Sequence, residues 1–85
     1  MGDYHVRGRV IGYIYDELEQ AQSKFPAFHS AHEGWAVIKE ELDELWEVVR
    51  ENQSLPGRDD RLRKEAIQVA AMALRFLVDM PGFTN

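Results

Sequence analysis

Three stretches of the chain repeat apolar residues every three or four positions, the spacing that predicts amphipathic helices. The first stretch covers residues 5–24 and places Val10, Ile14 and Leu18 on one face. Phe25-Pro26 follows it directly. Because a proline disfavours helical geometry in the residue before it, we expect the first helix to end there.

The second stretch, residues 30–51, opens with the capping-box sequence Ser30-Ala31-His32-Glu33. In such a box the serine hydroxyl accepts from the glutamate N–H, and the glutamate carboxylate accepts from the serine N–H. The apolar residues that follow form an arc of about 100°, the width that is typical of a core-facing helix side. We expect this arc to face the core; it consists of Trp35, Ile38, Leu42, Leu45, Trp46 and Val49.

The third stretch, residues 59–79, follows a loop-forming segment and begins near Asp59 or Asp60, either of which suits an N-cap. Residues 66–78 read AIQVAAMALRFLV, which is apolar on nearly every side. A helix of that kind is buried all round, and two partner helices cannot cover it. We therefore expect a single domain over residues 1–85, an all-α three-helix protomer that assembles with itself into a helical bundle, as a dimer or a dimer of dimers.

Composition narrows the function classes. The 85 residues include no cysteine, which excludes disulfides, zinc–thiolate sites and a cysteine nucleophile. Fifteen acidic and ten basic residues give a net charge of −5, the wrong sign for a general nucleic-acid binder. The sequence has no apolar run of membrane-spanning length, and its first residues lack the apolar segment of a signal peptide. We expect a cytoplasmic domain with no nucleic-acid or membrane partner.

The second helix is strongly acidic, and a solvated face is one explanation for its carboxylates. The third helix offers another, because Glu65 and Gln68 lie three residues apart on an otherwise apolar helix. At least one of them should be partly buried, and a buried carboxylate needs a partner. Either Lys64 or Arg61 is that partner, or the carboxylate faces acidic residues of the second helix with a divalent cation between them.

Two segments together resemble the MazG-like branch of the all-α nucleoside triphosphate pyrophosphohydrolases. They are HEGWAVIKEELDELWEVV and, after a gap of 15 residues, EAIQVAAMALRF. Glu40-Glu41-Leu42-Asp43-Glu44 matches the EExxE motif of that superfamily, and Glu65 opens its ExxD motif. Gln68 stands where the aspartate of ExxD is expected. The resemblance covers about residues 24–79.

The resemblance implies Mg²⁺-dependent hydrolysis, with Mn²⁺ as a substitute, of standard or modified nucleoside triphosphates to monophosphate and pyrophosphate. It implies that Glu41, Glu44 and Glu65 ligate the metal and that Glu40 is a further ligand or the base that orients the attacking water. Gln68 would contribute a neutral amide oxygen or hold a metal-bound water.

Five further residues are candidates for binding the substrate. Two are aromatic and would either stack on the base or belong to the core. Three are cations that would contact phosphates. For Arg75 the alternative to a phosphate contact is an ion pair with Asp79 or with an acid of the second helix. The five are Lys24, Phe28, Trp35, Lys64 and Arg75. Two other functions stay open: a non-catalytic module that binds a nucleotide or a metal, and a purely structural helical oligomer.

Overall fold

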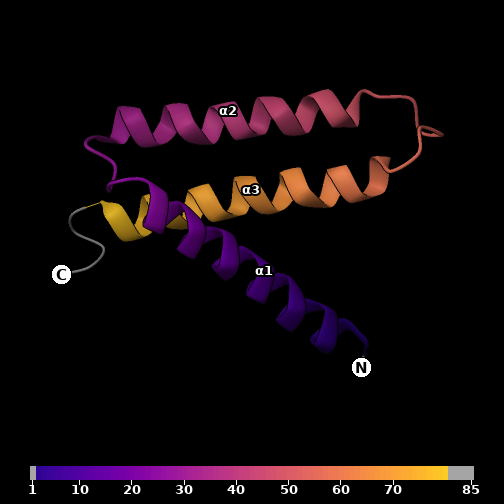
Figure 1. Cartoon of the computed structure of the whole chain (residues 1–85), viewed down its shortest axis with the longest axis horizontal. Coiled ribbons are helices and arrows are strands. Elements are labelled where there is room, and N and C mark those ends of the chain that lie inside the picture. The colour runs from indigo at the N-terminus through magenta and orange to yellow at the C-terminus, as the bar shows by residue number, and fades with distance from the viewer. Residues whose placement is uncertain (1, 81–85) are drawn as a thin grey trace.

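The computed structural model describes residues 2–80, which form three helices and, within that range, no strand. They are α1 (Gly2–Lys24), α2 (Ala31–Val49) and α3 (Arg58–Asp79). α2 and α3 run side by side as an antiparallel hairpin, and α1 packs across α3 with its N-terminal half extending away (Figure 1). The predicted all-α class is confirmed, and α1 ends just before Phe25-Pro26 as expected.

The start of α2 confirms half of the predicted capping box. Ser30 is the N-cap, and its hydroxyl oxygen accepts from the Glu33 N–H at 3.1 Å. The glutamate carboxylate does not return to Ser30; it accepts from the backbone N–H of His29 at 3.1 Å. This backbone bond, followed by the side-chain bond with His29, lowers the pKa of Glu33.

The start of α3 differs from the prediction. Its N-cap is Gly57, in the left-handed conformation with φ 78°, and not Asp59 or Asp60. Both aspartates lie in the first turn instead, where the positive end of the helix dipole favours carboxylates. Gly57 follows a proline in a tight connection, and glycine is the residue that adopts positive φ without steric cost.

α2 uses a different face against α3 from the one that its apolar arc predicts. Gly34 and Val48 are the buried positions of α2. Trp35, Leu42, Trp46 and Val49, which the sequence assigned to the core, are exposed. The reason is a close approach at Gly34: a Cβ there would overlap the ring of Phe76 and lie 3.1 Å from Phe28. Because only glycine fits here, α2 turns Gly34 toward α3, and its apolar arc does not face α3.

The core of the described chain is thin. Its buried apolar side chains come from all three helices and the α1–α2 loop: Leu18, Phe28, Val48, Ala71 and Met72. Helix α3 is not covered all round within this chain, since Ala66, Ala73, Leu77 and Val78 are exposed. Within residues 2–80 no helix combines the length and the hydropathy needed to cross a bilayer.

Candidate functional site

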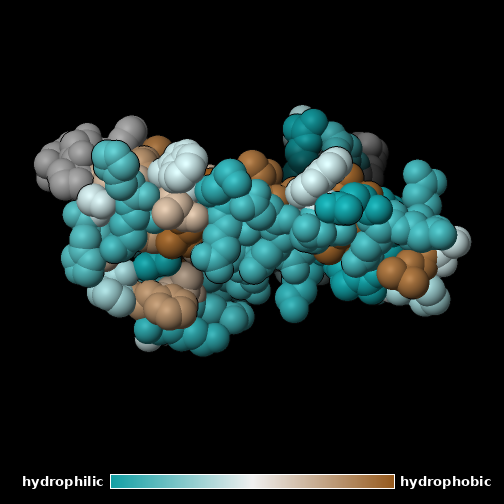
Figure 2. All heavy atoms as spheres, turned by 90° about the horizontal axis from the view of Figure 1, so that it is seen from above, coloured by the Kyte–Doolittle hydropathy of each residue, from teal (hydrophilic) through white to brown (hydrophobic). Residues whose placement is uncertain are grey.

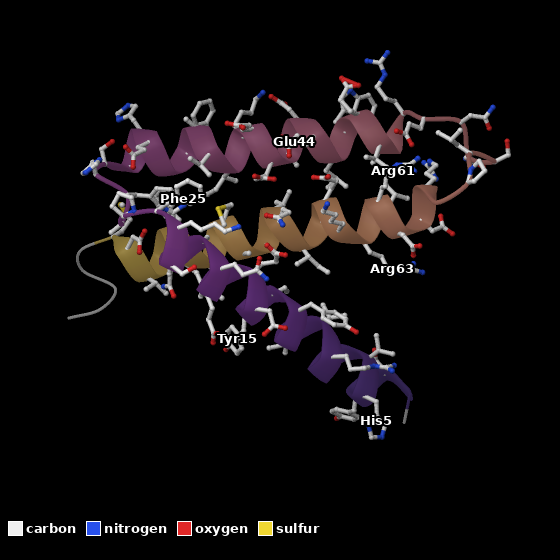
Figure 3. All side chains as sticks on the ribbon, viewed as in Figure 1. His5, Tyr15, Phe25, Glu44, Arg61 and Arg63 are labelled. Atoms are coloured by element: carbon white, nitrogen blue, oxygen red, sulfur yellow. The ribbon has the colours of Figure 1, made fainter. Side chains whose placement is uncertain are left out.

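Three carboxylates from two helices converge between α2 and α3. Glu41 and Glu44 lie one turn apart on α2, and the antiparallel hairpin brings Glu65 of α3 opposite them. One carboxylate oxygen from each of the three lies within 4.8 Å of the other two. Glu41 and Glu65 are half-buried and Glu44 is exposed; Figure 3 labels Glu44 midway along the stretch of α2 that runs beside α3. The structure thus brings together the three glutamates predicted as metal ligands.

No cation of the described chain neutralises this cluster. Among residues 2–80, every ion pair within 4 Å involves other carboxylates. Arg61, one of the cations considered as a partner for Glu65, pairs instead with Glu51 at 2.5 Å near the hairpin turn. Lys64, the other, has no carboxylate within 4 Å in the same part of the chain.

The clustering changes the protonation of Glu41. Burial, then the charge of Glu44 and a hydrogen bond shared with it, raises the pKa of Glu41 from 4.5 to about 7; Glu65 and Glu40 add smaller repulsions. At neutral pH the glutamate therefore holds a proton for part of the time. A bound cation would relieve the same repulsion, and three hard oxygen donors are a set that suits Mg²⁺. The donors present thus fit a divalent metal chemically.

Gln68 lies one turn beyond Glu65 on α3, and its amide is turned toward α1. Its Nε2 donates to Glu17 Oε2 at 2.7 Å. Both side chains are half-buried. The position where the resemblance expects an aspartate is thus occupied by a side chain that links α3 to a carboxylate of α1.

Glu17 is the residue of this region that the sequence interpretation missed. It lies three residues after Ile14 and four before Ala21, the spacing of the apolar face of α1, and all three are half-buried. A single carboxylate within an apolar stripe was the available signal, because such a group needs a polar partner once the stripe is buried.

A pocket of about 650 Å³ opens beside the cluster, with Glu41 on its border. α1, the α1–α2 loop, α2 and α3 all contribute to its lining. It brings together seven of the residues predicted for the site: Lys24, Phe28, Glu40, Glu41, Lys64, Gln68 and Arg75. Trp35 is not among the residues that line it. The predicted substrate residues are therefore grouped around one cavity, with that single exception.

The aromatic and basic residues of the pocket differ in what they already contact. Phe28 is buried against Phe76, with ring centroids 6.5 Å apart. Lys24 and Lys64 are exposed, and within residues 2–80 neither has a carboxylate within 4 Å. The two lysines are thus the side chains of the pocket whose charge remains available to an anionic ligand.

Arg75 is only 6 % exposed, and its contacts link α3 to the α1–α2 loop. Its Nη2 donates to the Pro26 carbonyl at 2.7 Å, and its Nε lies 3.5 Å from Asp79 Oδ2. Its guanidinium carbon lies 4.1 Å from the centre of the Phe28 ring. Asp79 also accepts from the Phe28 N–H at 3.0 Å. Arg75 therefore makes the pairing with Asp79 that was the alternative to a phosphate contact, and it anchors the α1–α2 loop on α3.

Compared with family models, curated proteins and solved structures, the chain matches none.

Proposed function

We propose that this protein is a Mg²⁺-dependent nucleoside triphosphate pyrophosphohydrolase. The observation that carries the proposal is the convergence of Glu41, Glu44 and Glu65 beside a pocket with two exposed lysines. The resemblance of the two acidic segments to the MazG-like enzymes also supports it, because the motif positions of that resemblance are the three glutamates that converge.

The three glutamates would hold the metal. Burial first, and then repulsion from Glu44, raises the pKa of Glu41 to about 7, so metal binding should be accompanied by proton release near neutral pH. When bound, Mg²⁺ supplies neutralisation of charge on the phosphate oxygens and increases the acidity of water.

The remaining chemistry falls to the residues of the pocket. Glu40 lines the cavity next to Glu41 and is exposed, which suits a base that orients the attacking water and takes its proton. The water oxygen bonds to the α-phosphorus, the bond to the bridging oxygen of the β-phosphate breaks, and pyrophosphate leaves. Lys24 and Lys64 bind the phosphate oxygens of the substrate, because their charges are not paired with a carboxylate of the described chain.

The test is pyrophosphate release from a panel of nucleoside triphosphates with Mg²⁺, using the wild-type chain and two matched variants. Glu44→Gln removes an exposed ligand with little effect on packing, and Glu47→Gln removes an exposed carboxylate one turn further along α2, outside the cluster. We expect Glu44→Gln to lower turnover about 100-fold, since several kcal/mol of charge stabilisation are lost. Glu47→Gln should stay within about twofold of wild type, because exposed positions away from a site contribute little.

One observation favours a second function, a non-catalytic module that binds a metal or a nucleotide. The Gln68 Nε2 donates to Glu17, so the fourth position of the acidic motif adds no charge to the cluster, and the amide N–H is engaged with α1. Calorimetric titration with Mg²⁺ distinguishes the cases. Metal binding without pyrophosphate release from any nucleotide indicates the module, and absence of metal binding leaves only a structural role for the cluster.

A further inference from the structure

Glu17 of α1 is a carboxylate of the pocket that the proposed function leaves without a role. It lines the cavity together with Gln68 and Glu41. Exposed polar side chains are ordinary in this chain, whose surface on the α2 side is mostly hydrophilic (Figure 2). Glu17 differs from them because it is half-buried within the apolar face of α1. No lysine, arginine or histidine nitrogen of residues 2–80 lies within 4 Å of its carboxylate, so an ion pair does not account for it.

The bond between Glu17 and Gln68 determines which end of the Gln68 amide faces α1. An ionised carboxylate accepts hydrogen bonds and donates none, so only the NH₂ group of a glutamine can bond to it. The Nε2 of Gln68 accordingly donates to Glu17 Oε2 at 2.7 Å, in a part-buried bond. Turning the amide over would break this bond and place two acceptors against each other. Glu17 therefore holds the amide in one of its two orientations.

The oxygen of the same amide remains available to the cavity. Gln68 Oε1 accepts no hydrogen bond from residues 2–80, and it is accessible rather than buried. Gln68 lies about 5 Å along α3 from Glu65, whose carboxylate converges with those of α2. An amide oxygen is an acceptor and a neutral ligand of the kind that hard cations take. Gln68 thus offers an oxygen beside the carboxylates while its nitrogen is held by α1.

A residue that orients the amide is needed here because of how glutamine differs from aspartate. The two oxygens of an aspartate are equivalent, so either orientation of its carboxylate offers an acceptor. A glutamine amide offers its oxygen in one orientation and its NH₂ group in the other, and an NH₂ group repels a cation. Gln68 stands where the resemblance expects an aspartate. The hydrogen bond to Glu17 supplies the constraint that this exchange requires.

We propose that Glu17 is a positioning residue of the carboxylate site, which fixes the Gln68 amide so that Oε1 faces a bound divalent cation or a water on that cation. The inference rests on the proposed function, since the cation is the one assigned to the three glutamates. Glu17 acts through Gln68 and is not itself a ligand, because its carboxylate is not among the oxygens that converge within 4.8 Å. Hydrogen-bond partners that orient metal ligands in this way contribute about 10- to 100-fold to metal affinity.

Calorimetric titration of the metal-free chain with Mg²⁺, without nucleotide, tests the inference on three variants of α1. Glu17→Leu removes the acceptor and should weaken Mg²⁺ binding about tenfold. Glu17→Gln removes the charge but keeps an oxygen that accepts from Gln68 Nε2, so its affinity should stay within about threefold of wild type. Glu19→Gln removes an exposed carboxylate of α1 outside the pocket and should stay within about twofold.

The pattern of affinities distinguishes positioning from other roles of Glu17. Equal losses in Glu17→Leu and Glu17→Gln show that only the charge matters, and this overturns the proposal. Unchanged affinity in Glu17→Leu, with a lower free energy of unfolding in urea, shows a purely structural link and also overturns it. In a Gln68→Leu background, Glu17→Leu should cause no further loss, because no amide is left to orient. A wild type that binds no Mg²⁺ overturns the proposed metal site together with this inference, whereas equal binding by wild type and Glu17→Leu overturns the inference alone.

A measurement on the wild-type chain does not depend on the folding of any variant. In a nitrogen–proton correlation spectrum, the side-chain NH₂ signals of Gln68 should shift when Mg²⁺ is added, because a cation near Oε1 draws electron density from Nε2. The NH₂ signals of Gln22, which is exposed and lies outside the pocket, should stay in place. If Mg²⁺ binds and the Gln68 signals do not move, the amide oxygen does not face the cation and the proposal is wrong.

Discussion

Replacing Glu41 with glutamine should remove a pH dependence from the stability of the protein. In the folded chain the pKa of Glu41 is raised from 4.5 to about 7, chiefly by burial and then by Glu44. A group with a raised pKa in the folded state stabilises the fold fully below its unfolded pKa, and this contribution is lost as the pH rises. The free energy of unfolding of the wild type should therefore decrease between about pH 4.5 and pH 7 and level off above that range.

The size of the effect follows from the shift. A rise of the pKa from 4.5 to about 7 corresponds to at most about 3 kcal/mol. Glu41 is half-buried and Glu44 is exposed, so water screens part of their repulsion, and we expect about 1–2 kcal/mol. Glutamine keeps the shape of the side chain without the charge. The Glu41→Gln variant should match the wild type near pH 4, below the ordinary pKa of glutamate, and exceed its stability at pH 8 by that amount.

Urea unfolding followed by circular dichroism measures this difference, at one protein concentration and with a chelator present. Any contribution of the three histidines is common to both proteins and cancels in the comparison. Glu47→Gln serves as the control, because it removes an exposed carboxylate of the same helix outside the cluster. If wild type and Glu41→Gln differ equally at pH 4 and pH 8, neither burial nor Glu44 disfavours the ionised form of Glu41, and the geometry of the cluster is wrong.

Two further substitutions test the packing around the site. Gly34→Ala should lower the free energy of unfolding by about 1–3 kcal/mol, because the added Cβ meets the Phe76 ring, with its Cε2 at 2.8 Å. Gly12→Ala, where nothing lies within 4 Å of the added Cβ, should raise the free energy of unfolding by about 0.5–1 kcal/mol. If urea unfolding shows a change of the same sign for both variants, the packing described at Gly34 is wrong. Gln68→Asp removes the donor to Glu17 and adds a second carboxylate, so metal-free stability should decrease by about 1–3 kcal/mol. A thermal melt identical to that of wild type would show that this bond contributes nothing.

Local signals in the sequence were sufficient for the helices and for the choice of acidic residues. Ser30 caps α2 as predicted, and Pro26 follows the end of α1 closely, because both effects act within one turn of backbone. Glu41 and Glu44 share one side of α2 by their three-residue spacing alone. The acidic motifs also indicated Glu65 as their counterpart, and the antiparallel hairpin places it there.

Local sequence signals did not predict which polar groups form hydrogen bonds with each other. Gln68 and Glu17 are 51 residues apart in the chain, and only the packing of α1 across α3 brings them into hydrogen-bond contact. Arg75 lies at a position that suited a phosphate contact, yet the α1–α2 loop folds back so that the Pro26 carbonyl accepts from it. A buried polar group forms hydrogen bonds with the groups that the fold places near it. The sequence alone does not show which groups those are.

The sequence by itself determined which residues share a side of each helix; the tertiary structure decided which side faces the core. Periodicity specifies the angles between side chains of one helix, but it leaves free the rotation of that helix against its neighbour. For α2 the rotation is set where Gly34, which has no side chain, admits the ring of Phe76. That contact turns Glu41 toward α3 and leaves Trp35 and Trp46 exposed, because one rotation moves every residue of a rigid helix together.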